Sequence, residues 1–279
     1  MARQRLGQHF LADAGWREEI ARAIRVSQSI APPASANSAE FCWIEIGAGH
    51  GEMTEHLAST GVPVHAIELD PLLAAALKRI AKRFPNLEIV SADILESDIA
   101  KIAAGRRVRI YGNLPYYITS PILHHLFTSA ELIEEIDIVV QHEVALRLAA
   151  QPGTRDYGYL SVLTQYFSRP ELVLEIPQGA FRPPPEVSSA LVTLRFPGER
   201  AKLPQIDEAS FLEFVKMCFS QKRKTLVNNL KSRVKPDLAR EALADLKLRA
   251  DARAEQLSVA NLAAVFRQIE VSSPWPSER

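Results

Sequence analysis

Short apolar runs alternate with amphipathic stretches along the first half of the chain. Five runs have the length and the β-branched content of buried strands: residues 41–46, 64–67, 87–90, 108–111 and 136–140. The stretches between them show helical spacing, and Pro71 stands at the favoured first position of one such helix. Alternation of strands and helices over about 100 residues predicts a parallel sheet wrapped by helices.

The pattern changes after a helical stretch at residues 157–167. Two apolar runs, 172–176 and 190–196, follow without a helix between them, which predicts an antiparallel hairpin that closes the far edge of the sheet. Residues 197–206 lack periodicity and indicate a linker. Four helical stretches follow at 209–219, 223–233, 237–246 and 258–269. We therefore expect an α/β domain at residues 1–197 and a small all-α domain at residues 207–279.

Composition narrows the class of protein. Of the 279 residues 47% are hydrophobic, as in an ordinary globular core, and no run of about 18 apolar residues predicts a transmembrane helix. Residues 1–10 are basic and polar, without the apolar centre of a secretory signal. Cys42 and Cys218 fit no metal or redox spacing. We expect a cytoplasmic protein that binds no membrane and no metal, with both thiols buried.

A glycine-rich turn follows the first strand of the sheet. Gly47, Gly49 and Gly51 would let the backbone approach a ligand closely, although this spacing alone is a weak signal. Glu68 ends the next strand about 20 residues later, where nucleotide-binding folds place the acid that binds a ribose. Asp93 ends the third strand and is suited to accept from an adenine amine. Both acids have plainer alternatives, Glu68 as a surface acid and Asp93 as a helix cap.

Residues 113–117 follow the fourth strand and carry the chemistry most specific to this chain. The Asn113 side-chain oxygen and the Leu114 carbonyl can accept both hydrogens of an exocyclic amine. Tyr116 offers a flat face on which a nucleobase can stack. The alternative is a strand-to-loop turn with a buried tyrosine.

Two further segments carry candidate contacts. Residues 178–186 contain three consecutive prolines, and their stiffness would hold Phe181 and Arg182 over the sheet edge; a rigid spacer with a core phenylalanine is the alternative. Residues 216–235 contain seven basic and no acidic residues. As one helix, the segment would place Lys224, Lys231 and Lys235 on a face opposite an apolar stripe, which favours RNA phosphate over a merely solvated face.

Together these motifs resemble the ribosomal RNA adenine dimethyltransferase family. The matching segments, in the order of the family, are residues 7–11, 45–51, 68–70, 113–121, 181–189 and 221–230. The resemblance implies a class I methyltransferase fold with a Rossmann-like sheet and S-adenosylmethionine as cofactor. It implies as substrate two adjacent adenines near the 3′ end of small-subunit rRNA, within the assembling 30S subunit. We expect a monomer.

The resemblance also assigns roles to residues of this chain. The expected cofactor-binding residues are His9, Leu11, Gly47, Gly49, Glu68, Asp93 and Asn113. The expected catalytic residues are Asn113, Leu114, Tyr116 and Phe181. The expected RNA-binding residues are Arg182, Lys222, Arg223, Lys224, Lys231 and Lys235. Two positions depart from the family, with His9 where Asn is common and Glu186 where Lys is usual.

Three other functions compete with this interpretation. A sister family methylates large-subunit rRNA and confers antibiotic resistance, but Leu114, Tyr117 and residues 221–230 favour the small-subunit branch. An assembly or transcription factor that binds without catalysis has no need of the amine clamp at Asn113. A DNA adenine methyltransferase would share the chemistry and leave the C-terminal match unexplained.

Overall fold

The computed structural model describes residues 9–26, 41–115, 117–272 and 275. The chain forms two compact units, which we describe separately. The first comprises residues 1–145 and 170–196, and the second comprises residues 146–169 and 197–279. The boundary within α6 (His142–Ala149) assigns the helical stretch at 159–167 to the second unit.

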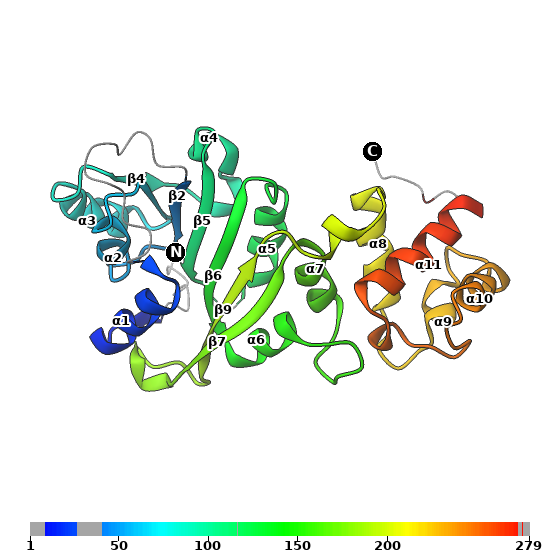
Figure 1. The fold of residues 1–279 in the computed structure, drawn as a ribbon. Helices are drawn as coiled ribbons and strands as arrows, with labels where there is room; N and C mark the ends of the chain where they lie inside the picture. The colour runs from blue at the N-terminus through cyan, green and yellow to red at the C-terminus, as the bar shows by residue number, and fades with distance from the viewer. Residues whose placement is uncertain (1–8, 27–40, 116, 273–274, 276–279) are drawn as a thin grey trace, which may run out of the picture. The chain divides into compact units, whose positions relative to one another are not determined.

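A seven-stranded sheet forms the centre of the first unit (Figure 1). Its order is β4-β3-β2-β5-β6-β9-β7. The strands are β2 (Phe41–Ile46), β3 (Val64–Glu68), β4 (Leu87–Ser91), β5 (Arg107–Asn113), β6 (Ile133–Gln141), β7 (Arg169–Ile176) and β9 (Ser189–Arg195). β2 to β6 are parallel, and β9 runs antiparallel to β6 with β7 at the edge. This mixed sheet confirms the predicted methyltransferase fold with its closing hairpin.

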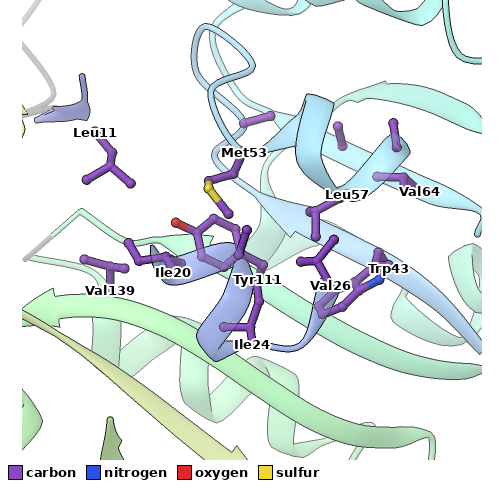
Figure 2. Close-up of a cluster of buried hydrophobic side chains, with 14 of the residues drawn as sticks. Leu11, Ile20, Ile24, Val26, Trp43, Met53, Leu57, Val64, Tyr111 and Val139 are labelled. Carbon is purple, nitrogen blue, oxygen red and sulfur yellow. The ribbon is translucent and has the colours of Figure 1, made fainter. Parts of the chain in front are cut away.

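Helices cover the sheet because each connection between parallel strands must cross a face of it. In the first unit they are α1 (Ala14–Ala23), α2 (Thr54–Ala58), α3 (Pro71–Ala81), α4 (Ile99–Ala103) and α5 (Thr119–Phe127). Asp13 and Asp70 cap α1 and α3 through side-chain hydrogen bonds to the backbone, as their sequence positions favour. Figure 2 shows side chains of α1 and α2 packed with Trp43 and Tyr111 of the sheet in one hydrophobic cluster.

A second, two-stranded sheet joins distant segments of the first unit. β1 (Phe10–Leu11) pairs antiparallel with β8 (Phe181–Arg182), so that Phe10 faces Arg182 and Leu11 faces Phe181. Backbone amides of Ala12 and Asp13 continue the contact by donating to the carbonyl oxygen of Ala180, at 2.9 and 3.1 Å. The start of the described chain is thereby fixed to the proline-rich connection after β7.

The second unit is helical. Its helices are α7 (Tyr159–Phe167), α8 (Glu208–Cys218), α9 (Leu226–Leu230), α10 (Pro236–Asp245) and α11 (Val259–Ser272). Phe211, Phe214 and Phe266 are fully buried and contact each other through ring centroids 5.3–6.5 Å apart. No helix in the described ranges is long and apolar enough to cross a membrane.

The expected helix at residues 223–233 is wrong in its extent. Thr225 caps α9 at its start, where its side chain accepts from the amide of Asn228, and Lys231 ends the helix after five residues. Lys235 is already the N-cap of α10. The three lysines therefore do not share one helical face, although the apolar stripe of Leu226, Leu230 and Val234 is buried as predicted.

Candidate active site

The glycine-rich turn between β2 and α2 adopts a backbone that side chains disfavour. Gly47, Gly49 and Gly51 have φ angles of +68°, +60° and +91°. A Cβ at Gly51 would lie 2.3 Å from Cδ1 of Ile80, and a Cβ at Gly49 would lie 3.1 Å from the ring of Phe10. Glycine at these two positions is thus required both by conformation and by the close approach of α3 and β1.

Glu68 holds this turn in place. Its side chain is only 2% exposed, and Oε2 accepts from the amide of Gly49 at 2.9 Å. Oε1 accepts from the amide of Asp70, also at 2.9 Å. Each carboxylate oxygen keeps a further lone pair, so Glu68 can organise the turn and still accept from ribose hydroxyls.

Asn113 ends β5, and the backbone of His9 orients its side chain. Its Nδ2 donates to the carbonyl oxygen of His9 at 2.8 Å, which leaves Oδ1 as the end of the amide that can accept. His9 is itself anchored, because its Nδ1 donates to the carbonyl oxygen of Pro183 at 2.8 Å. Leu114 is buried at 1% exposure, and its amide donates to Val139. These contacts fix the Asn113 amide and the backbone of Leu114, the two groups for which the sequence predicts an amine clamp.

Two hollows open beside Gly47. The Glu68 cleft holds about 500 Å³ of empty space, part of it open to solvent, and its lining includes Glu68, Asp93 and the apolar side chains of Ile94, Ile118 and Ile122. The Asn113 pocket holds about 310 Å³ of empty space, part of it open to solvent, and its lining includes Phe10, Leu11, Glu45, Tyr111 and Asn113. A ligand with a flat apolar end, a ribose and a charged tail would match these two hollows in order.

Burial shapes the electrostatics of the Asn113 pocket. Burial, opposed by the Thr54 side chain and aided by the negative charges of Glu52 and Glu68, raises the pKa of Glu45 to about 8. Burial likewise raises the pKa of the Tyr111 hydroxyl, with Glu45 and Asp137 adding to the effect. Both groups are therefore neutral near pH 7 in the structure as it stands.

The structure brings most of the predicted cofactor-binding residues together. Leu11, Gly47, Gly49 and Asn113 line the Asn113 pocket, and Gly47, Glu68 and Asp93 line the Glu68 cleft. His9 lines neither hollow and instead holds Asn113. Asp93 also fills the alternative role weighed for it, because its Oδ1 caps the short 3-10 helix at Ile94–Glu96.

The structure does not support a stacking role for Phe181, one of the two predicted stacking residues. Tyr116 lies outside the described residues. Phe181 is fully buried in the hydrophobic cluster that contains Leu11 and Ile176, so it presents no face to a base. This corrects the expected stacking role, because pairing of β8 with β1 turns the ring into the core. Arg182 next to it is exposed, and its guanidinium donates to the carbonyl oxygens of Gly179 and Phe181.

The basic residues of the second unit differ in their contacts. Lys222 donates to the carbonyl oxygen of Arg155, and Arg233 pairs with Glu213 of α8, an acid that spacing within the segment could not reveal. Arg223 and Lys224 are exposed before α9. Lys231 and Lys235 are exposed after it.

Glu45 and Tyr111 are site residues that the sequence reasoning missed. The available signal was a charged residue in an otherwise apolar strand, directly before the glycine-rich turn. Such a residue is buried with its strand and must face either a partner or a pocket.

Comparison with known proteins decides the family. A family model described as "Ribosomal RNA adenine dimethylase" matches residues 1–270. The chain belongs to this family. As a ribosomal RNA adenine dimethylase it is an S-adenosylmethionine-dependent methyltransferase, which confirms the enzyme class and the cofactor expected from the sequence.

Relatives of this dimethylase are similar along nearly their whole length. "Ribosomal RNA small subunit methyltransferase A" of Koribacter versatilis is 38% identical over 95% of the chain and 93% of the relative. The protein of the same name from Acidobacterium capsulatum is 39% identical over 95% of the chain and 90% of the relative.

Solved structures agree in fold. A dimethyladenosine transferase from Plasmodium falciparum superimposes with a TM-score of 0.75 at 24% identity, covering 92% of this chain and 96% of that one. The 23S rRNA methyltransferase ErmE gives a TM-score of 0.67 at 26% identity, covering 94% and 99%.

The residues of this dimethylase fit the cofactor. Glu68 has lone pairs for the ribose, Asp93 and the isoleucines of the cleft suit an adenine, and the Asn113 pocket suits the amino acid part. When bound, S-adenosylmethionine supplies an activated methyl group on a sulfonium centre.

Proposed function

We propose that this enzyme methylates the N6 amines of two adjacent adenines near the 3′ end of 16S rRNA, within the assembling 30S subunit, and gives dimethyladenosine at both. The observation that carries the proposal is the fixed Asn113 amide: its nitrogen is held by His9, its oxygen is left to accept, and the residue lines the pocket next to the glycine-rich turn. The small-subunit substrate is supported by the names of relatives that are 38% and 39% identical along nearly the whole chain.

The chemistry asked of the protein is mainly positioning. Asn113 Oδ1 and the Leu114 carbonyl would accept the two amine hydrogens and turn the nitrogen lone pair out of conjugation with the ring. The target adenine must leave its base stack to reach them, and Tyr116 is the proposed stacking partner. The nitrogen becomes acidic once it is alkylated, so its proton can leave without a dedicated base. Orientation and exclusion of water then account for the rate.

RNA binding is proposed for the exposed basic residues. Arg223, Lys224, Lys231 and Lys235 form no ion pair within the described part of the second unit, and they offer charge to phosphate. Lys222 and Arg182 complete the proposed set. We propose residues 1–197 as the methyltransferase domain, residues 207–279 as the RNA-binding domain, a monomeric enzyme and a cytoplasmic site of action.

Transfer of a labelled methyl group tests this function. Purified 30S and 50S subunits that lack the modification are offered separately, with Asn113→Ala as the matched inactive control. We expect label on the 30S subunit with the unmodified enzyme and almost none with the variant. Label on the 50S subunit alone would assign the enzyme to the sister activity. Full subunit binding without transfer would favour an assembly factor.

A further inference from the structure

The loop at residues 150–158, between α6 and α7, is tied to later segments of the second unit. Near its start the amide of Gly153 donates to the carbonyl oxygen of Glu255 at 2.7 Å. Near its end the hydroxyl of the buried Tyr157 donates to the carbonyl oxygen of Leu257 at 3.0 Å. The residues between these two contacts are exposed, but the loop is fixed on both sides of them.

Lys222 makes a third tie, at the centre of this loop. Its ammonium group donates to the carbonyl oxygen of Arg155. The backbone at Arg155 cannot shift without breaking this contact, so Lys222 helps to determine where the Arg155 guanidinium lies. That side chain is exposed and forms no ion pair with another described residue.

The turn that carries Lys222, between α8 and α9, is itself held from the inside by Asn229. Asn229 is 7% exposed, and its Nδ2 donates to the carbonyl oxygens of Cys218 and Gln221 at 2.6 and 3.2 Å. The amide of Lys224 donates to the same Gln221 oxygen at 3.0 Å. The turn is therefore as firmly held as the loop that it touches.

The loop and the turn together form a basic surface, which we call the Arg155 surface. Its exposed basic residues are Arg155, Lys222, Arg223 and Lys224. Asp156 is the single acidic residue in the sequence of the two segments, residues 150–158 and 219–225. An excess of exposed positive charge favours a polyanion, and a surface that is already ordered loses little conformational entropy when it binds one.

We propose that Arg155 contacts a phosphate of small-subunit rRNA beside Arg223 and Lys224, and that Lys222 is a positioning residue that holds Arg155 in place. The inference deepens the proposed function and rests on it, because it requires the second unit to bind this RNA. It adds a residue to the expected RNA-binding set and gives Lys222 a different role within it. Spacing could not show the pair, because the two residues are 67 positions apart.

The two roles follow from what each side chain can still bind. The Arg155 guanidinium carries five N–H donors in a planar fork that matches phosphate oxygens. The Lys222 ammonium has three donors and already uses one on a backbone oxygen, which would lose this donor if the ammonium moved to a phosphate.

Binding of the full-length protein to purified 30S subunits, measured over a range of salt concentrations, tests the Arg155 contact. Arg155→Gln should lower the log–log slope by about 0.7–0.9 and weaken binding by about 5- to 8-fold at 0.1 M salt, the counterion release of one phosphate. Arg240→Gln is the matched control, because Arg240 is an exposed arginine of the same unit that already pairs with Asp237. It should keep the wild-type slope.

A double-mutant cycle tests the role of Lys222. Lys222→Met removes the donor and should weaken binding alone, but add no further loss of affinity or slope to Arg155→Gln. Lys222→Arg keeps a donor at this place and should bind like the unmodified protein. Affinity for S-adenosylhomocysteine and the unfolding temperature should stay unchanged in all variants, which shows that they are folded.

The outcomes separate this inference from the proposed function. A wild-type slope in Arg155→Gln overturns the phosphate contact. Additive losses in the double variant overturn the positioning role, because Lys222 would then contact phosphate itself. Failure of the unmodified protein to bind 30S subunits would overturn the proposed function instead.

Discussion

At the scale of single residues, the site depends on side chains that are held before any ligand arrives. The His9 carbonyl accepts from the Asn113 amide, and Glu68 accepts from Gly49 and Asp70. His9 contributes through its backbone and is anchored by its ring at Pro183, so its departure from asparagine leaves the contact to Asn113 intact. Preorganised polar groups of this kind stabilise a transition state without reorganising.

Asn113→Ala is expected to slow turnover by raising its activation free energy by about 2.7–4 kcal/mol, the loss typical of one positioned polar group. Donor affinity should fall less, because Glu68, Asp93 and the glycine-rich turn remain. Single-turnover kinetics and calorimetry on the same variant measure the two effects. A large loss of donor affinity with normal turnover would exchange the roles of Asn113 and Glu68.

Glu68→Gln should weaken donor binding and also destabilise the protein by about 1–3 kcal/mol, because an amide nitrogen would face a backbone N–H that Glu68 now satisfies. Glu52→Gln is the matched control at a less buried acid beside the same turn. Denaturant unfolding and ligand titration check both variants. Unchanged stability in Glu68→Gln would mean that the carboxylate serves the ligand alone.

At the scale of elements, the order of strands and helices follows from the sequence because period and length separate them clearly. The strand ends that carry Glu68, Asp93 and Asn113 meet at one edge, as parallel pairing requires. Two features could not be predicted from the sequence. Thr225 caps α9 and shortens it, and a phenylalanine between glycine and prolines suits a core or a binding surface equally well. In the fold Phe181 pairs with Leu11 of β1 and is buried in the hydrophobic cluster.

Phe181→Ala should destabilise the protein by roughly 3–5 kcal/mol, the cost of truncating a buried aromatic ring. Phe181→Leu keeps most of the volume and should leave the Michaelis constant for RNA unchanged. Thermal unfolding and steady-state kinetics measure these outcomes. A raised Michaelis constant at full stability would restore the stacking role that the buried ring argues against.

Asp137, which is fully buried in β6, predicts a pH dependence of the protein's stability. Burial and the neighbouring Glu135 carboxylate raise the pKa of Asp137, while the Thr193 hydroxyl, Arg195 and Arg25 oppose this rise. Above its ordinary pKa of about 3.9 the unfolded aspartate ionises while the folded one keeps its proton, so stability falls as pH rises toward the folded pKa. Asp137→Asn should reduce that slope by at most about 1.4 kcal/mol per pH unit. An unchanged slope in unfolding measured from pH 5 to 8 would show that Asp137 is ionised in the fold.

At the scale of the whole molecule, a chain of zero net charge must segregate its charges to hold RNA. The lysines of the second unit are exposed, although α9 does not align them as the sequence suggested. Spacing alone could not show this, because the turn between α9 and α10 replaces the helix that would have aligned them.

Changing Lys224, Lys231 and Lys235 to Gln should weaken binding to 30S subunits and flatten its salt dependence. The log–log slope should fall by about 0.7–0.9 for each phosphate that the variant no longer neutralises. Lys78, Lys82 and Lys101 of the first unit are exposed as well and provide the control triple variant. Donor binding should stay normal in both. A wild-type slope in the first variant would place the RNA elsewhere.

The most direct measurement of the central claim is mass spectrometry of the 3′-terminal fragment of 16S rRNA, after reaction of the enzyme with unmodified 30S subunits. The account predicts two adjacent adenosines, each carrying two methyl groups on N6, and no such product with Asn113→Ala. Methylation confined to 23S rRNA, to a pyrimidine, or to a position other than the adenine N6 amine would contradict it.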